Sequence, residues 1–140
     1  MDQIPKVGVG VLIFKEGKIL LGKRKGSHGE GEYSGPGGHL DYEEYLKDCA
    51  IREVKEECNI NIKNLKFVCL VDRIKSSPKH YVTAIFYSEF DGGELKIMEP
   101  DKCESLDWYD LDNLPSPMFY YAMKGIDSYK TGRNFFDIEK

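Results

Sequence analysis

Three glutamates in a short stretch, Glu53, Glu56 and Glu57, have the spacing of groups that act together on one helix face. At roughly 100° per residue, Glu53 and Glu57 each fall within about 20° of the direction of the apolar residue Leu46. Two carboxylates therefore share the inward side of this helix with apolar residues. Buried carboxylates are costly unless a cation compensates them, so the pattern predicts a divalent metal site.

The competing interpretation is an acidic helix exposed to solvent, which is common in proteins. The other polar residues of the segment, among them Glu44, Asp48 and Lys55, project in different directions and would form that solvated face. A structural calcium loop is not indicated, because the chain has no D-x-D-x-D-G run.

The carboxylates must be positioned by the elements around them, and these elements are visible in the hydropathy pattern. We expect a helix from Glu43 or Glu44 to Cys58, ended by Asn59 in the left-handed conformation. A glycine-rich loop, Gly26–Gly38, precedes it and is of the kind that carries function. A second helix is expected after Pro117, with this proline near its first turn.

Alternating and apolar runs predict strands on both sides of the first helix. The expected strands are Val7–Phe14 and Lys18–Arg24, which form a hairpin, then Leu65–Ile74, His80–Phe90 and Glu104–Leu111, with a polar turn at 75–79. Hairpins combined with two separate helices indicate an α+β domain with helices packed on a sheet.

Composition narrows the functional class. The 140 residues fit one domain, and the net charge of −4 argues against a protein that binds nucleic acid polymers or membrane surfaces. No apolar run approaches the roughly 20 residues of a membrane span. The four cysteines form no CxxC pair, and the first residues lack a secretory pattern, so we expect a reduced, cytoplasmic protein.

The segment around the glutamates resembles the signature of the Nudix hydrolases: Gly, five residues, Glu, seven residues, then Arg-Glu-apolar-x-Glu-Glu-x-Gly-apolar. The matching residues are Gly38, Glu44, Arg52, Glu53, Val54, Glu56, Glu57 and Ile60. Asn59 replaces the usual glycine, which it can do because asparagine tolerates the same backbone. Gly35 stands where the family usually has an apolar residue. From Val7 to Tyr121 the chain is similar to the MutT-type branch, the nucleotide triphosphate diphosphatases.

This resemblance implies the Nudix fold over residues 1–140, an α/β/α sandwich with a mixed sheet between helices. It implies a Mg²⁺ or Mn²⁺ site, for which hard oxygen ligands are suited. Glu53 and Glu57 match the principal ligands, Glu56 the accessory ligand, and the Gly37 carbonyl completes the set. Arg52 resembles the structural arginine that pairs with Glu44.

The general base stays open at this point among three carboxylates, Glu53, Glu99 and Glu104. Lys23 and Arg24 precede the glycine-rich loop and are candidates for binding polyphosphate, together with Gly37 and Gly38.

For the base of a nucleotide, Phe119 and Tyr120 align with an aromatic pair that the resembled branch uses, although aromatic residues on a helix also serve as core. His80 is a further candidate pocket residue, which as a strand residue could simply pack.

Signature residues of ADP-ribose, dinucleoside polyphosphate, NADH and coenzyme A hydrolases are missing, which favours nucleoside triphosphates as substrates. The expected products are a nucleoside monophosphate and pyrophosphate, with possible preference for modified nucleotides. The alternatives are hydrolysis of another nucleoside diphosphate derivative, such as a nucleotide sugar, or a non-catalytic module that senses a nucleotide. By analogy with the same branch, a homodimer is expected.

Overall fold

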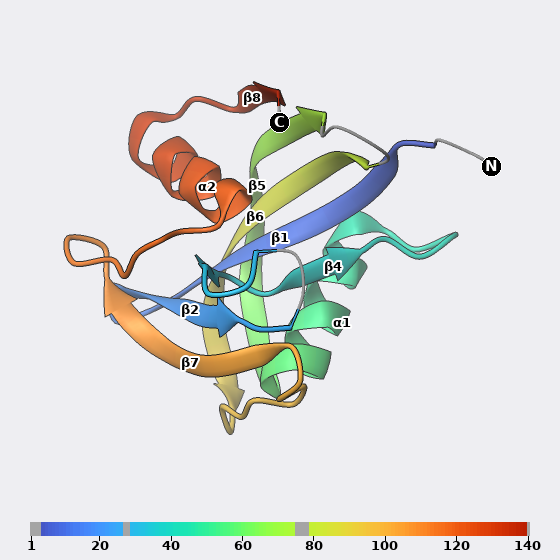
Figure 1. Ribbon diagram of the computed structural model, residues 1–140. Coiled ribbons are helices and arrows are strands. Elements are labelled where there is room, and N and C mark those ends of the chain that lie inside the picture. Colours follow the sequence, from blue (N-terminus) through green and yellow to red (C-terminus); the bar gives the residue numbers. More distant parts are fainter. Residues whose placement is uncertain (1–3, 27–28, 75–78, 140) are drawn as a thin grey trace.

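One mixed β-sheet runs through the molecule and carries a helix on each face, as the computed structural model shows (Figure 1). The structure describes residues 4–26, 29–74 and 79–139. The elements in chain order are β1 (Lys6–Lys15), β2 (Lys18–Arg24), β3 (Tyr33–Ser34), β4 (Gly37–His39), α1 (Leu46–Cys58), β5 (Ile60–Ile74), β6 (His80–Gly93), β7 (Cys103–Asp110), α2 (Tyr120–Thr131) and β8 (Phe135–Glu139).

The strand order is β3-β2-β1-β6-β5-β8, with β4 paired to β1 and β7 paired to β2. The pairs β1–β6 and β5–β8 are parallel, and the remaining pairs are antiparallel. β1 and β2 form the expected hairpin, because Glu16 and Gly17 both adopt the positive φ that a tight two-residue turn requires. β4 and β2 lie along the same edge of β1, so the glycine-rich loop is drawn onto the sheet.

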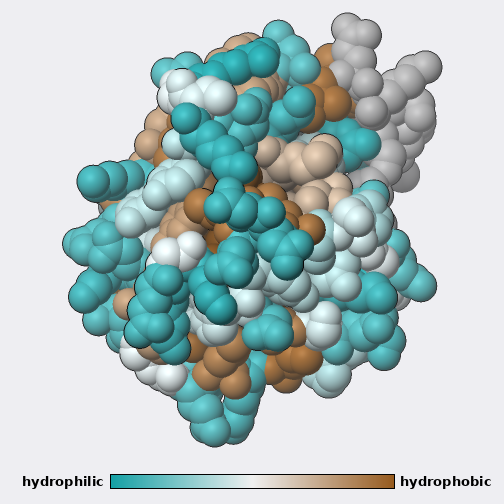
Figure 2. Space-filling view, turned by 90° about the vertical axis from the view of Figure 1, so that its left-hand side faces the viewer, coloured by the Kyte–Doolittle hydropathy of each residue, from teal (hydrophilic) through white to brown (hydrophobic). Residues whose placement is uncertain are grey.

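Alternation along β1 divides the core into two layers. Val9, Val11 and Ile13 pack with the buried face of α1, whereas Leu12 and Phe14 pack with α2 on the other side of the sheet. This two-sided burial confirms the α+β sandwich with a mixed sheet that the sequence predicts. The surface over α2 is mostly hydrophilic, with apolar side chains visible between polar ones (Figure 2).

Several expected boundaries were wrong. α1 begins at Leu46 rather than at Glu43 or Glu44, because Glu43 has a positive φ of 63° and the Glu44 amide bonds back to Asp41 in a turn. The end at Asn59 is confirmed, since this residue is left-handed with φ 63° and its amide donates to the Lys55 carbonyl.

Pro117 lies outside α2, which starts at Tyr120 with Phe119 as its N-cap residue. β5 begins five residues before the expected Leu65. Its antiparallel pairing with β6 is interrupted by register shifts. β3, β4 and β8 were not predicted. The expected turn at 75–79 lies almost wholly outside the described residues.

Candidate active site

The carboxylates of α1 face the backbone of β4, across a contact that only glycine permits. A side chain at Gly38 would overlap the Glu53 carboxylate, and one at Gly37 would overlap the Val9 carbonyl of the neighbouring strand β1. The Gly37 amide donates to Glu57 Oε1 at 3.3 Å. The glycine pair therefore lets the helix carry two carboxylates up to the sheet edge.

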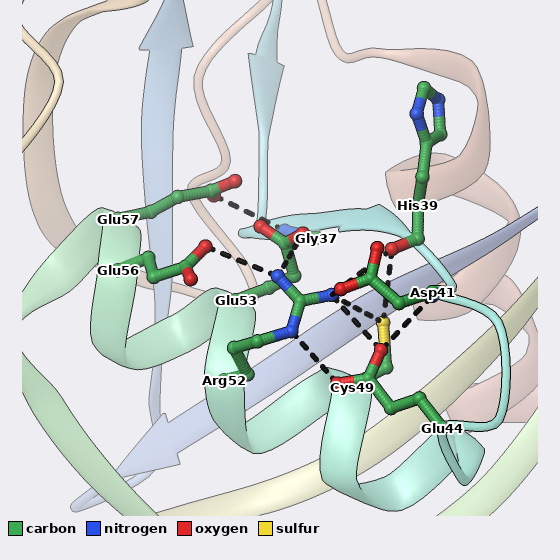
Figure 3. Close-up of polar contacts among 9 residues, drawn as sticks. All are labelled: Gly37, His39, Asp41, Glu44, Cys49, Arg52, Glu53, Glu56 and Glu57. Carbon is green, nitrogen blue, oxygen red and sulfur yellow. Dashed lines mark hydrogen bonds and ion pairs between the residues drawn. The ribbon is translucent and has the colours of Figure 1, made fainter.

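Arg52 is the hub that joins α1 to the segment after β4 (Figure 3). Its Nε donates to Glu44 Oε2 at 2.8 Å and its Nη2 to Glu44 Oε1 at 3.0 Å, a two-point contact that suits a guanidinium. Nη2 also reaches the His39 carbonyl at 3.2 Å. The sequence-based pairing of Arg52 with Glu44 is thus present in the geometry.

The same guanidinium lies between two of the predicted metal ligands. Arg52 Nη1 is 3.1 Å from Glu53 Oε2 and 3.2 Å from Glu56 Oε1. Glu53 is largely buried, with 13% of its side chain exposed, whereas Glu56 is 53% exposed. The cluster of Arg52, Glu53, Glu56 and Glu57 is called the glutamate cluster below.

Electrostatics separate the carboxylates into two groups. The hydrogen bonds from Arg52 hold the pKa of Glu44 at about 2, so Glu44 is ionised at neutral pH. Burial raises the pKa of Glu57 to about 8, and the nearby charge of Glu53 adds to the rise. Burial likewise raises the pKa of Glu53. Carboxylates whose ionised form is destabilised in this way are ready to gain from a bound cation.

We tested whether these residues fit a divalent metal. In the part of the chain that the structure describes, no three acidic, histidine or cysteine side chains already form a closed coordination group. The donors nevertheless fit in kind: Glu53 and Glu57 are hard oxygen ligands with unfavourable mutual charge, and the backbone of Gly37 lies beside them. A metal would be held by Glu53, Glu56 and Glu57.

A cleft of about 570 Å³ opens beside the glutamate cluster. Its lining includes the acidic side chains of Glu53, Glu56 and Glu57. Basic and aromatic side chains line the same cleft: the basic residues are Lys23, Arg24, Lys25, Lys79 and Lys102, and the aromatic ones are Tyr81, Phe119, Tyr120 and Tyr121. An anion that carries a planar group would find a matching partner in each of these three groups.

The predicted residues divide into those that line this cleft and those that do not. Glu99 lines it and contributes to the raised pKa of Glu57. Glu104 is not a lining residue; it is 56% exposed and pairs with Lys23 at 3.6 Å.

His80 also lies outside the cleft, bonded to Asp72 at 2.7 Å. Because strand residues alternate between faces, its neighbour Tyr81 is the one that enters the cleft.

Tyr121 was missed by the sequence reasoning. Its hydroxyl donates to the Gly35 carbonyl at 3.2 Å, and its ring fills the space that the absent side chain of Gly10 leaves. The alternate glycines of β1 were a signal for such a close approach, but they did not identify the partner.

Comparison with known proteins agrees with this geometry. The model of the NUDIX domain matches residues 4–127. The chain belongs to the Nudix hydrolase family. An ADP-ribose pyrophosphatase of Methanocaldococcus jannaschii is 32% identical over 131 residues, which are 93% of this chain and 76% of that protein.

Two further relatives extend the comparison. The crystal structure of a MutT Nudix hydrolase from Burkholderia pseudomallei has a TM-score of 0.84 and 33% identity, covering 89% of this chain and 98% of that one. The NAD-capped RNA hydrolase NudC of Photorhabdus laumondii is 34% identical over 106 residues, 74% of this chain but only 38% of NudC.

Membership in this family makes the protein an enzyme, a Nudix pyrophosphohydrolase that acts on nucleotide substrates. Nudix hydrolases generally use divalent metal ions, which is the class of ligand that the glutamate cluster fits.

None of the described helices is long and apolar enough to cross a membrane.

Proposed function

We propose that this Nudix hydrolase converts nucleoside triphosphates, including modified deoxynucleotides, to nucleoside monophosphate and pyrophosphate. The observation that carries the proposal is that acidic and basic side chains line one cleft together with the aromatic side chains Phe119 and Tyr120. A polyphosphate fits between a metal on the glutamates and the cations Lys23 and Arg24.

In this reaction a water oxygen attacks the β-phosphorus, and the anhydride bond to the α-phosphate breaks. Mg²⁺ or Mn²⁺ on Glu53, Glu56 and Glu57 supplies charge neutralisation for the phosphates. The water's proton passes to a carboxylate. Of the three candidates, Glu53 is already assigned to the metal, and Glu99 suits the role better than Glu104, because Glu99 lines the cleft and lies close enough to Glu57 to affect its pKa.

Hydrolysis of ADP-ribose is the second candidate. It is favoured by the 32% identity to the archaeal ADP-ribose pyrophosphatase over nearly the whole chain. The missing signature of ADP-ribose hydrolases argues against this substrate, but it weighs less than the similarity to a relative over nearly the whole chain. Both reactions would use the same walls of the cleft.

A substrate panel in the presence of Mg²⁺ separates the two candidates. It includes common, oxidised and methylated nucleoside triphosphates, ADP-ribose and a nucleotide sugar, with products identified by chromatography. We expect the highest kcat/KM for a triphosphate, and pyrophosphate as product. In ¹⁸O-water the label should enter pyrophosphate and not the monophosphate. Faster turnover of ADP-ribose, or release of inorganic phosphate from triphosphates, would overturn the proposal.

The proposal also includes a cytoplasmic location and a homodimer. The four cysteines are free thiols, as a reducing compartment requires. The dimer rests on the resemblance to the MutT-type branch, and light scattering tests it: the expected mass is twice that of the chain.

A further inference from the structure

Tyr120 lines the cleft at the start of α2, and its ring contacts a cationic side chain. The guanidinium of Arg73, on β5, lies over the Tyr120 ring with its carbon 4.0 Å from the ring centre. Arg73 itself does not line the cleft. Tyr120 further contacts Phe119 and Tyr121, at centroid distances of 4.7 Å and 5.7 Å. Tyr120 is therefore fixed from outside the cleft by one charged residue.

The position of Arg73 carries an electrostatic cost. Its Nε is shielded from solvent and has no hydrogen-bond partner among the described residues. A buried donor without a partner is destabilising, so a side chain placed only for stability would be better replaced by an apolar one. Described acidic side chains form ion pairs with Arg52, Lys23, Lys63 and Lys96, and not with Arg73. The guanidinium of Arg73 instead makes a cation–π contact with the Tyr120 ring.

We infer that Arg73 is a positioning residue that holds the Tyr120 ring as a preformed stacking surface for the base of the nucleotide. The inference rests on the proposed function only in taking the substrate to be a nucleotide. A ring held in place before binding loses less conformational freedom when the base stacks on it, which strengthens binding. Arg73 thereby selects for substrates with a base, although it touches neither phosphate nor metal.

A positioning role for Arg73 affects binding of the base and not the chemistry at the phosphates, so KM and kcat are measured for substrates with and without a base. In Arg73→Met, the KM for a nucleoside triphosphate should rise roughly three- to tenfold, the size expected when one side chain must be ordered on binding, with kcat within twofold of wild type. The KM for ribose 5-triphosphate, which has no base, should not change. Arg73→Lys keeps the charge but not the planar face, and it should lose most of the same affinity.

Arg133→Met is the matched control, because Arg133 lies over the Phe136 ring at 4.5 Å on the β8 side of the molecule. It should change neither KM. Tyr120→Ala completes the test: combined with Arg73→Met, it should give no larger rise in KM than Tyr120→Ala alone. Melting temperatures of all variants show that each is folded.

Three results would overturn the inference: an unchanged KM in Arg73→Met, an equal rise for ribose 5-triphosphate, or an Arg73 effect that persists without the Tyr120 ring. Binding of a non-hydrolysable α,β-methylene nucleoside triphosphate, measured by calorimetry, keeps this test independent of turnover. If that analogue binds and shows the Arg73 effect while no triphosphate is cleaved, the proposed function fails and the positioning role stands.

Discussion

At the scale of single residues, one helix and the turn before it hold carboxylates in opposite electrostatic states. Glu44 is kept ionised by two hydrogen bonds from Arg52, whereas Glu57 is buried near a like charge and its pKa is raised to about 8. Both belong to the same sequence signature. Glu44 fixes Arg52 in place, whereas the ionised form of Glu57 is destabilised and would be stabilised by a bound cation.

The raised pKa of Glu57 has a consequence for stability. A carboxyl whose folded pKa lies above its unfolded pKa favours the folded state at low pH, and this contribution is lost as pH rises. The metal-free protein should therefore lose stability between about pH 4.5 and about pH 8, whereas Glu57→Gln should be less sensitive to pH in that range. At pH 8 we expect the melting temperature of Glu57→Gln in EDTA to exceed that of wild type by several degrees.

The same variant should have lost its response to Mg²⁺. Wild type should gain stability from Mg²⁺ at pH 8 and hydrolyse its substrate, and Glu57→Gln should do neither, with activity down by roughly 10³-fold or more. Asp48→Asn is the matched control, since it makes the same change at an exposed position of α1 and should behave as wild type. Wild-type-like Mg²⁺ stabilisation of Glu57→Gln would exclude Glu57 as a ligand.

Glu99 and Glu104 are the candidates for the general base outside the glutamate cluster. Glu99→Gln should lower kcat by roughly 10²- to 10⁴-fold with little change in KM, because it removes a proton acceptor and leaves the binding walls intact. Glu104→Gln should stay within a fewfold of wild type, since Glu104 lies outside the cleft and pairs with Lys23 at its surface. Kinetics at saturating Mg²⁺ decide between them. The reverse order of effects would transfer the role to Glu104.

At the scale of elements, the site depends on how closely β4 approaches both of its neighbours: Gly38 lies against α1, and Gly37 lies against β1. A methyl group at Gly38 meets the end of a flexible side chain, Glu53, which can turn away. A methyl group at Gly37 meets the backbone carbonyl of Val9, which cannot. The two positions thus differ in what a substitution would disturb.

Gly38→Ala should therefore keep most of the stability and lose most of the activity, since Glu53 must leave its place. Gly37→Ala should be destabilised by roughly 1–3 kcal/mol, as for overpacking in a rigid surrounding. Melting temperatures and kcat/KM of the pair, measured side by side, test this. Equal loss of stability in both variants would show that Glu53 cannot move as argued.

The sequence could predict the elements whose pattern is local. The hairpin of β1 and β2, the inward direction of Glu53 and Glu57, and the stop at Asn59 follow from alternation, helical period and backbone preference. Pairing between distant segments left no such local trace. For that reason the sequence predicts a loop at β4, which needs β1 as its partner. It names His80 as a candidate pocket residue, and it does not identify Tyr81, which lines the cleft.

At the scale of the whole molecule, the last strand closes the sheet that supports the site. β8 pairs in parallel with β5 from Leu70 to Ile74, a stretch that includes Arg73, whose guanidinium lies over the Tyr120 ring. The sequence alone does not predict this strand, because it is only five residues long and forms by pairing with β5. The segment after α2 is nevertheless part of the core, since Phe136 is 1% exposed.

Phe136 and Phe135 provide a test of that view with one chemical change at adjacent positions. Phe136→Ala should cost roughly 3–5 kcal/mol, the range for a fully buried phenylalanine, because it leaves a cavity in the layer beneath α2. Phe135→Ala should cost well under half of that, as Phe135 is 45% exposed on the other face of β8. Urea denaturation of both variants measures the difference. Equal losses of stability in the two variants would contradict the burial of Phe136 beneath α2. In that case β8 would not be shown to support β5 or the cleft through this side chain.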